Sequence, residues 1–351
     1  MLTRGYGNTV TVMLRRAGAG QATPAPQSPS LSLDPLPATF AGLLPCADCP
    51  GIWYQLNVFA DGVFFLRMTY QDRNVAVDEV GRWLLSSDGR ILLLKGGRDA
   101  PVMLAIEDRD TLRLLSPEGE AIPSTLNYEL QRSIRVEPLE PRLNLDGMYG
   151  YVADAGVFTE CLTGRRLAVA QERDNAALET AYIQARRQAG EEMKVLVDAR
   201  LVVRPNPDTA AGQPALVVEQ FISLTPGDTC GVPFAAVPLE TTYWRAMQLG
   251  GKPVPAADAS REAHLVFEPG GRVAGSDGCN RVAGSYELNG DAITFGQMAP
   301  TRMACPDTSE TERAFHDVLT RASRWRILGD RLELFDAAGT RLARFEPAAG
   351  R

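Results

Sequence analysis

The chain has 351 residues, of which 45% are hydrophobic and 23% are charged. This composition is typical of a globular protein, and at roughly 150 residues per domain the length predicts two or three domains. Its 36 basic and 43 acidic residues give a net charge of −7, which argues against nucleic-acid binding through a broad basic face. No run reaches the roughly 18 apolar residues that a membrane-spanning helix requires.

The first 39 residues are predicted to form a disordered tether. A basic start is followed by residues 17–37, which are rich in Pro, Ala and Ser. A secretory signal needs an apolar core of about 7–15 residues, and the run Val10–Leu14 is shorter than that. No lipobox-like cysteine precedes the first domain either. Two interpretations stay open: the signal is missing from this reading frame, or the protein stays in the cytoplasm.

Residues 40–132 show short strands separated by turn signals. An alternating segment at 55–59 leads to Asp61-Gly62, and residues 63–68 supply the partner strand. Asp-Gly between two such runs is a strong hairpin signal. Regularly spaced strands of this kind predict a small antiparallel barrel or sandwich.

Residues 133–146 contain Pro138 and Pro141 and are predicted to be a linker. The second block, 147–233, is mostly β-like with one helix candidate at 172–189, where apolar residues recur at helical spacing. Such a pattern fits a small closed barrel of the OB type.

The third block, 241–347, follows a second linker at 234–240. It is again mostly strands, with one better-marked helix. Ser309 and Glu312 match a capping box. An apolar stripe follows, formed by Ala314, Phe315, Val318, Leu319 and Ala322.

Six cysteines occur, at Cys46, Cys49, Cys161, Cys230, Cys279 and Cys305. Their spacing suggests three sequential pairs, one per block, although six cysteines allow 15 connectivities. An even count favours an oxidising compartment such as a periplasm, and six reduced cysteines in the cytosol are the alternative. In the chain-entropy account a Cys161–Cys230 bridge would contribute about 4 kcal/mol and a Cys279–Cys305 bridge about 3.5 kcal/mol.

Cys46-Ala-Asp-Cys49 is the sharpest local motif. Such a pair can bind a soft metal as two thiolates, cycle as a labile disulfide, or staple a turn. A thioredoxin-like enzyme is less favoured, because Pro50-Gly51 and a strand follow instead of a helix. Met68 and Met103 could add thioether ligands for Cu(I), but methionines are more often core residues.

No catalytic residue is predicted. Ser276 and Cys279 lie in a Gly-rich segment where either could be a nucleophile, but no histidine stands in a recognisable partner position. A tight turn between two strands is the favoured interpretation. Only two histidines occur, His264 and His316, and neither is predicted to be a metal ligand or a catalytic group.

Three segments carry a resemblance to known envelope proteins. The run Phe-Ala-Gly-Leu-Leu-Pro-Cys-Ala-Asp-Cys-Pro-Gly-Ile at 40–52, the hairpin over Asp61-Gly62, the segment 81–83 and the closing segment 126–130 resemble the N-terminal domain of NlpE-type lipoproteins. Residues 147–164 resemble the OB-fold that follows in that family, where Cys161 would match a disulfide cysteine and Cys230 its partner. The third block resembles the META or HslJ-like domain through Trp244, 251–254, 278–281 and 301–306.

This resemblance implies a mainly β chain: a lipocalin-like barrel at 40–132, an OB-fold barrel with one helix at 147–233, and a META-type β domain with one helix at 241–347. It also implies a non-enzymatic envelope protein of copper homeostasis or stress sensing. Its barrel would respond through Cys46 and Cys49, by Cu(I) binding or thiol–disulfide change, with no obligatory cofactor. Cys161–Cys230 and Cys279–Cys305 would be inert staples.

The implied location is the periplasm or the inner face of the outer membrane. The implied partner is an envelope sensor kinase or another periplasmic protein, with no nucleic acid, and with membrane contact only through a lipid anchor that is not visible in the sequence. Two other functions stay open: an envelope module that binds a small molecule or oligosaccharide, and, less favoured, a thiol oxidoreductase.

Overall fold

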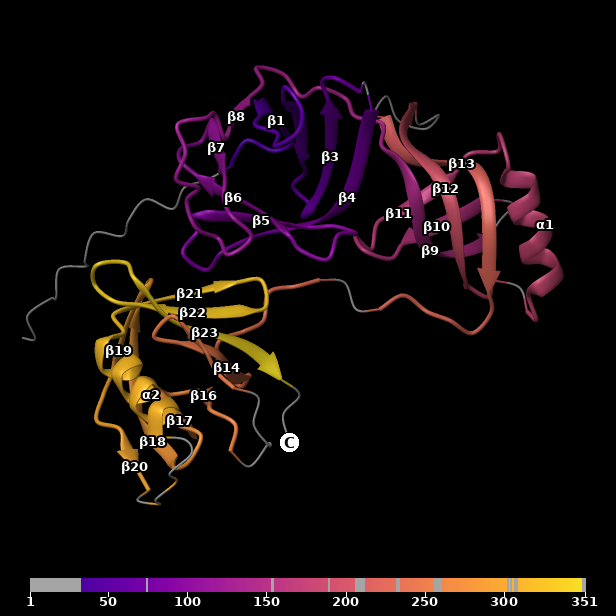
Figure 1. Cartoon of the computed structure of the whole chain (residues 1–351). Coiled ribbons are helices and arrows are strands. Elements are labelled where there is room, and N and C mark those ends of the chain that lie inside the picture. The colour runs from indigo at the N-terminus through magenta and orange to yellow at the C-terminus, as the bar shows by residue number, and fades with distance from the viewer. Residues whose placement is uncertain are drawn as a thin grey trace, which may run out of the picture.

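The computed structural model describes residues 33–348, except positions 74, 153–154, 189, 206–211, 232–233, 256–260, 302, 304 and 306–308. Three β-rich modules follow one another along the chain (Figure 1). The mainly β fold class is thereby confirmed, with two closed barrels and a third module built on one large sheet. Within the described residues, neither helix has the length and apolar character needed to cross a membrane.

Eight antiparallel strands close the first barrel in sequential order. They are β1 (Ala38–Leu44), β2 (Ile52–Val58), β3 (Val63–Tyr70), β4 (Val75–Leu85), β5 (Ile91–Lys95), β6 (Val102–Ile106), β7 (Thr111–Leu114) and β8 (Glu129–Arg132). The predicted hairpin joins β2 to β3, and Gly62 takes a φ of 80°, which favours glycine. Phe40 and Phe64 are fully buried in the interior, among aliphatic side chains from all around the barrel.

The residues just before β1 are part of this barrel. Leu33 is only 4% exposed and belongs to its core, and Leu36 packs against that core. Arg132 donates a hydrogen bond of 2.7 Å to the Leu33 carbonyl and lies over the Phe40 ring. The predicted tether of 1–39 is therefore too long, because Leu33 is buried in the barrel core and Leu36 packs against it. Residues 1–32 lie outside the described residues.

The second module is a closed five-stranded barrel with the order β10-β11-β13-β12-β9. Its elements are β9 (Arg142–Val152), β10 (Ala155–Glu160), β11 (Arg166–Val169), α1 (Asn175–Ala185), β12 (Met193–Pro205) and β13 (Gly212–Thr225). The rings of Tyr149 and Tyr182 meet edge to face in its core, 5.2 Å apart. Tyr182 thus fixes α1 on the barrel.

Two sequence-based boundaries in this module are wrong. The predicted linker at 133–146 already contains the start of β9, because the chain enters the sheet directly after Pro141. The predicted helix at 172–189 is shorter, since α1 covers only Asn175–Ala185. Arg186 follows with an extended backbone, so the helix ends well before the Gly190 turn.

The third module is a ten-stranded antiparallel sheet that wraps around one helix. Its elements are β14 (Tyr243–Leu249), β15 (Lys252–Pro253), β16 (His264–Glu268), β17 (Arg272–Ser276), β18 (Arg281–Asn289), β19 (Ala292–Phe295), β20 (Ala299–Pro300), α2 (Ser309–Arg321), β21 (Arg324–Leu328), β22 (Arg331–Phe335) and β23 (Arg341–Ala348). Trp244 is fully buried at the centre of the core. The predicted apolar stripe of α2 faces this core. Helix α2 begins at Ser309, and Glu312 accepts a hydrogen bond from the Asn280 side chain.

The outer face of β3 and β4 joins the first barrel to the OB barrel. Val63, Phe65 and Val80 point outward and belong to the same buried cluster as the OB core. Arg165 of the OB barrel stacks on Phe65 and forms a bidentate ion pair with Asp61, at 2.7 and 2.9 Å. The two barrels therefore share a continuous apolar core that is closed by a charged clamp.

The third module packs against another face of the first barrel. Leu328 of β21 is 1% exposed and lies among Leu93, Met103 and other buried residues of β5 and β6. Ser87 donates its backbone N–H to the Ile327 carbonyl at 2.9 Å, and its hydroxyl accepts from the Ile327 N–H at 2.8 Å. This contact has the apolar centre and polar rim of a specific interface.

Leu328→Ala should weaken this docking by about 3 kcal/mol, because a buried leucine is replaced and a cavity remains. Urea unfolding followed by tryptophan fluorescence would measure the loss. Leu288→Ala in the same module is the matched control, since Leu288 is 41% exposed and its truncation should change stability by less than about 0.5 kcal/mol. Equal losses in both variants would contradict this account of the interface.

Candidate functional site

The Cys46-x-x-Cys49 motif lies in the loop between β1 and β2, at one end of the first barrel. The two cysteines form a disulfide, with Cα atoms 5.2 Å apart, and both are partly exposed. Asp48 between them is exposed, and its carboxylate lies 2.8 Å from the Arg73 guanidinium and 3.3 Å from the Cys46 sulfur. Arg73 lowers the pKa of the Asp48 carboxyl by hydrogen bonding and by its charge.

The chemistry of this loop depends on its oxidation state. Soft metals bind cysteine as the thiolate. The two sulfur atoms are not thiolates while they are joined in the disulfide, so the oxidised loop does not offer this ligand pair. The two sulfur atoms and the Asp48 carboxylate lie within 4.8 Å of one another. After reduction the pair would fit Cu(I), whereas Asp48 is a hard oxygen ligand already paired with Arg73.

The structure separates the two methionines that the sequence offered as extra ligands. Met68 is 3% exposed inside the first barrel, where its sulfur lies 2.7 Å from an Arg98 nitrogen. Met103 is 2% exposed and belongs to the cluster under the third module. Both are thus packed in apolar clusters, on opposite faces of the barrel wall.

The other four cysteines are joined as Cys161–Cys230 and Cys279–Cys305. The first bridge ties the turn after β10 to the segment after β13. The second ties the turn between β17 and β18 to the segment before α2. Ser276 accepts a hydrogen bond from the Gly278 N–H at 3.1 Å. This segment is a tight turn, as predicted, and Cys279 has no free thiol for nucleophilic attack.

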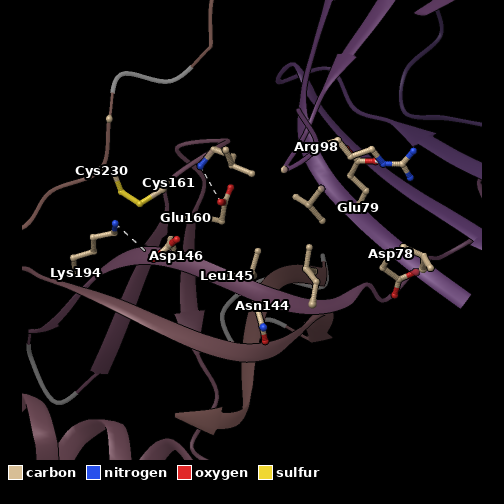
Figure 2. A pocket seen from close by; sticks show the side chains of 16 residues that line it. Asp78, Glu79, Arg98, Asn144, Leu145, Asp146, Glu160, Cys161, Lys194 and Cys230 are labelled. Atoms are coloured by element: carbon tan, nitrogen blue, oxygen red, sulfur yellow. Dashed lines mark hydrogen bonds and ion pairs between the residues drawn. A yellow bond between two sulfur atoms is a disulfide. The ribbon is translucent and has the colours of Figure 1, made fainter. Parts of the chain in front are cut away.

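A cavity of about 480 Å³ lies between the first barrel and the OB barrel (Figure 2). Glu79 of β4 and Arg98 of the loop after β5 line one wall, and Glu160 and the Cys161–Cys230 disulfide line the other. Glu160 is held by the N–H groups of Leu162 and Thr163. No sequence motif marked this cavity, because its two walls come from different modules.

Glu79 is an ionisable group of the cavity wall whose pKa is shifted by burial. It is 6% exposed, and its carboxylate lies 2.7 Å from the Arg98 Nε. Burial raises the pKa of Glu79 above its ordinary value near 4.5, and the positive charge of Arg98 only partly opposes this. The folded state therefore favours the protonated carboxyl more than the unfolded chain does.

Glu79→Gln should change the pH dependence of stability. A raised folded-state pKa gives stability that is present below the unfolded pKa and is lost as the pH rises through the folded value. Between pH 4.5 and 7 the wild type should lose stability relative to the variant, as measured by urea unfolding at each pH. Glu287→Gln, at an exposed position, makes the same charge change and should run parallel to the wild type. Parallel curves for Glu79→Gln would contradict the assignment.

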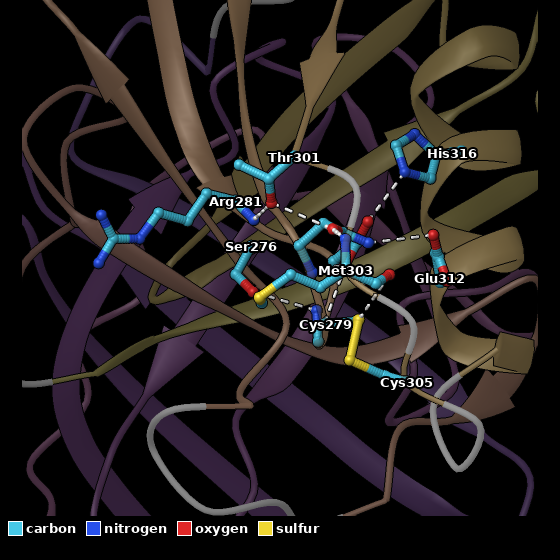
Figure 3. The surroundings of a disulfide bond; sticks show 11 residues. Ser276, Cys279, Arg281, Thr301, Met303, Cys305, Glu312 and His316 are labelled. Carbon is cyan, nitrogen blue, oxygen red and sulfur yellow. Dashed lines mark hydrogen bonds and ion pairs between the residues drawn. A yellow bond between two sulfur atoms is a disulfide. The ribbon is translucent and has the colours of Figure 1, made fainter.

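His316, which is not predicted from the sequence to be a ligand, lies in a cluster of ionisable side chains. Its Nε2 lies 2.9 Å from a carboxylate oxygen of the fully buried Asp277. Glu312 and His316 lie on the same helix beside the turn of Cys279 (Figure 3). The i, i+4 spacing of Glu312 and His316 on a predicted helix was a usable signal. Asp277 could not be added to it, because it is 39 residues away in sequence.

Three family models match the chain in succession. The NlpE N-terminal domain matches residues 40–125, the NlpE C-terminal OB domain residues 139–231, and the META domain residues 237–349. The chain is thus a three-module β protein of the NlpE type with an added META domain.

A curated relative places the chain in its family. It is 32% identical over 201 residues to the protein named lipoprotein NlpE of Escherichia coli strain K12, covering 56% of this chain and 82% of the relative. The chain belongs to the NlpE family.

Two solved structures are also similar. The crystal structure of the Cpx pathway activator NlpE from Escherichia coli is 28% identical, with a TM-score of 0.26, and the match covers 56% of this chain and all of that one. An NMR structure of a protein from Burkholderia xenovorans is 26% identical, with a TM-score of 0.28, and covers 37% of this chain and all of its own.

Proposed function

We propose that this chain is a non-enzymatic protein of the bacterial cell envelope that takes part in a stress response, with the Cys46–Cys49 pair as its responsive element. Membership of the NlpE family supports the general role, since one relative is named a lipoprotein and a Cpx pathway activator is among the similar structures. The partner would be an envelope sensor kinase or another periplasmic protein.

The position of the Cys46–Cys49 disulfide is the observation that carries the proposal. It lies in a partly exposed loop at the end of a barrel whose interior and two outer faces are tightly packed. Cys46 and Cys49 are only 3 positions apart in the sequence. The cysteines of Cys161–Cys230 are 69 positions apart and those of Cys279–Cys305 are 26 positions apart. Because the shortest loop loses least when it is opened, this bridge can change state without unfolding its module.

An external thiol would reduce the disulfide by thiol–disulfide exchange, supplying two electrons and two protons and being itself oxidised to a disulfide. Reduction, and the Cu(I) capture that it makes possible, would alter the surface that this loop presents. The Asp48–Arg73 ion pair joins it to the loop between β3 and β4. Breaking the disulfide frees the segment between the cysteines, and Cu(I) binding to both thiolates would fix it again in another form. Either change would be local and on the outside, where a partner can detect it.

A double variant tests whether this disulfide is a structural staple. Cys46→Ser/Cys49→Ser should cost at most about 2 kcal/mol, whereas Cys161→Ser/Cys230→Ser should cost about 4 kcal/mol, because the closed loops differ in length. Urea unfolding without reductant would measure both. A loss in the first variant as large as in the second would mean that Cys46–Cys49 is mainly structural.

Copper capture is tested on the intact chain after selective reduction. Anaerobic titration against a chromogenic Cu(I) chelator should show one Cu(I) per chain in the wild type and none in Cys46→Ser/Cys49→Ser. Met68→Leu is the control with similar volume, and it should still bind, because Met68 is inside the barrel beside Arg98. Unchanged uptake in the double serine variant would refute the metal part of the proposal.

The cavity between the barrels supports a second candidate function, a module that binds a small molecule or oligosaccharide. Its wall combines apolar residues with Arg98, Lys194 and several carboxylates. Such a ligand would not fill the first barrel itself, where Phe40, Phe64 and their neighbours pack the interior. Native mass spectrometry of the purified protein, with Glu79→Gln as comparison, would detect a co-purified ligand.

A thiol oxidoreductase is the least supported function. The strand β2 begins at Ile52, directly after the motif, so no helix N-terminus is available there to stabilise a thiolate. An insulin-reduction assay should therefore show no turnover.

A further inference from the structure

A buried aspartate lies in the turn between β17 and β18 of the third module. Asp277 is 0% exposed although it carries a carboxyl group. One oxygen, Oδ1, accepts hydrogen bonds from the backbone N–H groups of Cys279 and Asn280, at 2.9 and 2.6 Å. These two donors orient the group, so that Oδ2 is directed at His316 of α2.

Helix α2 presents two further ligand groups to the same point. Glu312 and His316 are four residues apart and therefore lie on one face of the helix. Asn280 donates a hydrogen bond of 3.2 Å to Glu312 Oε1. The ligand atoms of Asp277, Glu312 and His316 all lie within 4.8 Å of one another. The His316 side chain is 32% exposed, so an ion could enter from solvent.

The turn that carries Asp277 is fixed from several sides. The Cys279–Cys305 disulfide joins it to the segment before α2. Asn280 Oδ1 accepts hydrogen bonds from the Met303 N–H at 2.7 Å and the Thr301 hydroxyl at 3.1 Å. Gly278 has a φ of 98°, a backbone form that favours glycine. The carboxylate is thus held in position before any ligand binds.

We propose that Asp277, Glu312 and His316 bind one divalent transition-metal ion, of the kind represented by Zn²⁺. Imidazole nitrogens and carboxylate oxygens are both Zn²⁺ ligands, and zinc sites with three protein ligands are completed by water. With metal–ligand bonds near 2.0–2.1 Å, tetrahedral ligands lie about 3.3 Å apart. The Asp277–His316 contact of 2.9 Å would need to open by only a few tenths of an ångström, as the ion replaces the shared hydrogen.

The two carboxylates of the cluster accept hydrogen bonds from groups outside it, as the ligands of metal sites do. Ligating carboxylates in such sites are themselves held by outer donors, which set their direction. Asp277 and Glu312 both have such donors, and both sets of bonds involve Asn280. The imidazole makes the site ill suited to Ca²⁺ or Mg²⁺, which prefer oxygen ligands. The cluster is separate from Cys46 and Cys49, so the inference does not rest on the function proposed above.

The two histidines of the chain provide the test. Zn²⁺ is titrated into the metal-free, oxidised full chain, and the imidazole C–H signals are followed by NMR. His316 should shift with a stoichiometry of one ion, whereas His264, which stacks on Tyr243 in β14, should not. A tenfold excess of Ca²⁺ should leave the His316 signal of the Zn²⁺ complex unchanged.

Variants separate a metal site from a structural hydrogen bond. Glu312→Gln should weaken Zn²⁺ binding at least tenfold in calorimetry, and His316→Gln should abolish it. Glu310→Gln is the matched control, because Glu310 is an exposed neighbour paired with Lys252, and it should bind as the wild type does. Cys46→Ser/Cys49→Ser should also bind normally.

The proposal is overturned if millimolar Zn²⁺ leaves the His316 signal in place, if Ca²⁺ displaces Zn²⁺, or if Glu312→Gln binds as tightly as the wild type. Thermal melts of each variant show whether it is folded. If His316→Gln is unfolded, Glu312→Gln alone decides the outcome.

Discussion

Two strands of the first barrel are buried on both faces, and the arrangement of the whole chain depends on this. In β3 the side chains of Phe64 and Leu66 fill the barrel, while Val63 and Phe65 point outward into the OB core. In β5 the side chains of Leu92 and Leu94 face the barrel interior, while Ile91 and Leu93 face the third module. A barrel with such an outer surface would expose large apolar patches in water, so it needs both neighbours.

Charged groups then fix the orientation of these apolar contacts. At the OB junction, the Arg165–Asp61 pair closes one edge. At the other junction, the fully buried Glu333 binds Arg326 and lies near Arg341 and Arg344. Arg341 and Arg344 each donate a hydrogen bond to the Glu118 carbonyl of the first barrel. Apolar burial holds the modules together, and these directional bonds select one orientation.

Both candidate functional sites involve turns that connect the packed strands. The Cys46–Cys49 disulfide and the Asp277 cluster both lie in short turns held between packed strands. In the first turn Asp48 is next to Cys49 and forms an ion pair with Arg73. In the second turn Asp277 is two residues before Cys279 and contacts the His316 imidazole. The first turn is partly exposed and is joined to the loop between β3 and β4, whereas the second is tied to a helix and is largely buried. A change at the first can therefore stay local, while the second is suited to holding a ligand in fixed geometry.

Much of the fold could be predicted from local patterns. The Asp61-Gly62 hairpin and the apolar stripe of α2 were found because their signals lie within a few residues. The end of α1 was missed, since Arg186 leaves the helix without a glycine or proline at that point. The start of β9 was missed because Pro138 and Pro141 suggest a linker, although the strand begins directly after the second proline.

The sequence by itself determined the strand-rich character, the turns, the cysteine count and the consecutive apolar runs at 63–66 and 91–94. Those runs already indicate strands that are buried on both sides. Only the tertiary structure decided what covers them, which cysteines meet, and that Asp277 reaches His316. Periodicity and turn chemistry act over a few residues, whereas these contacts depend on how distant segments pack, and no local pattern encodes that.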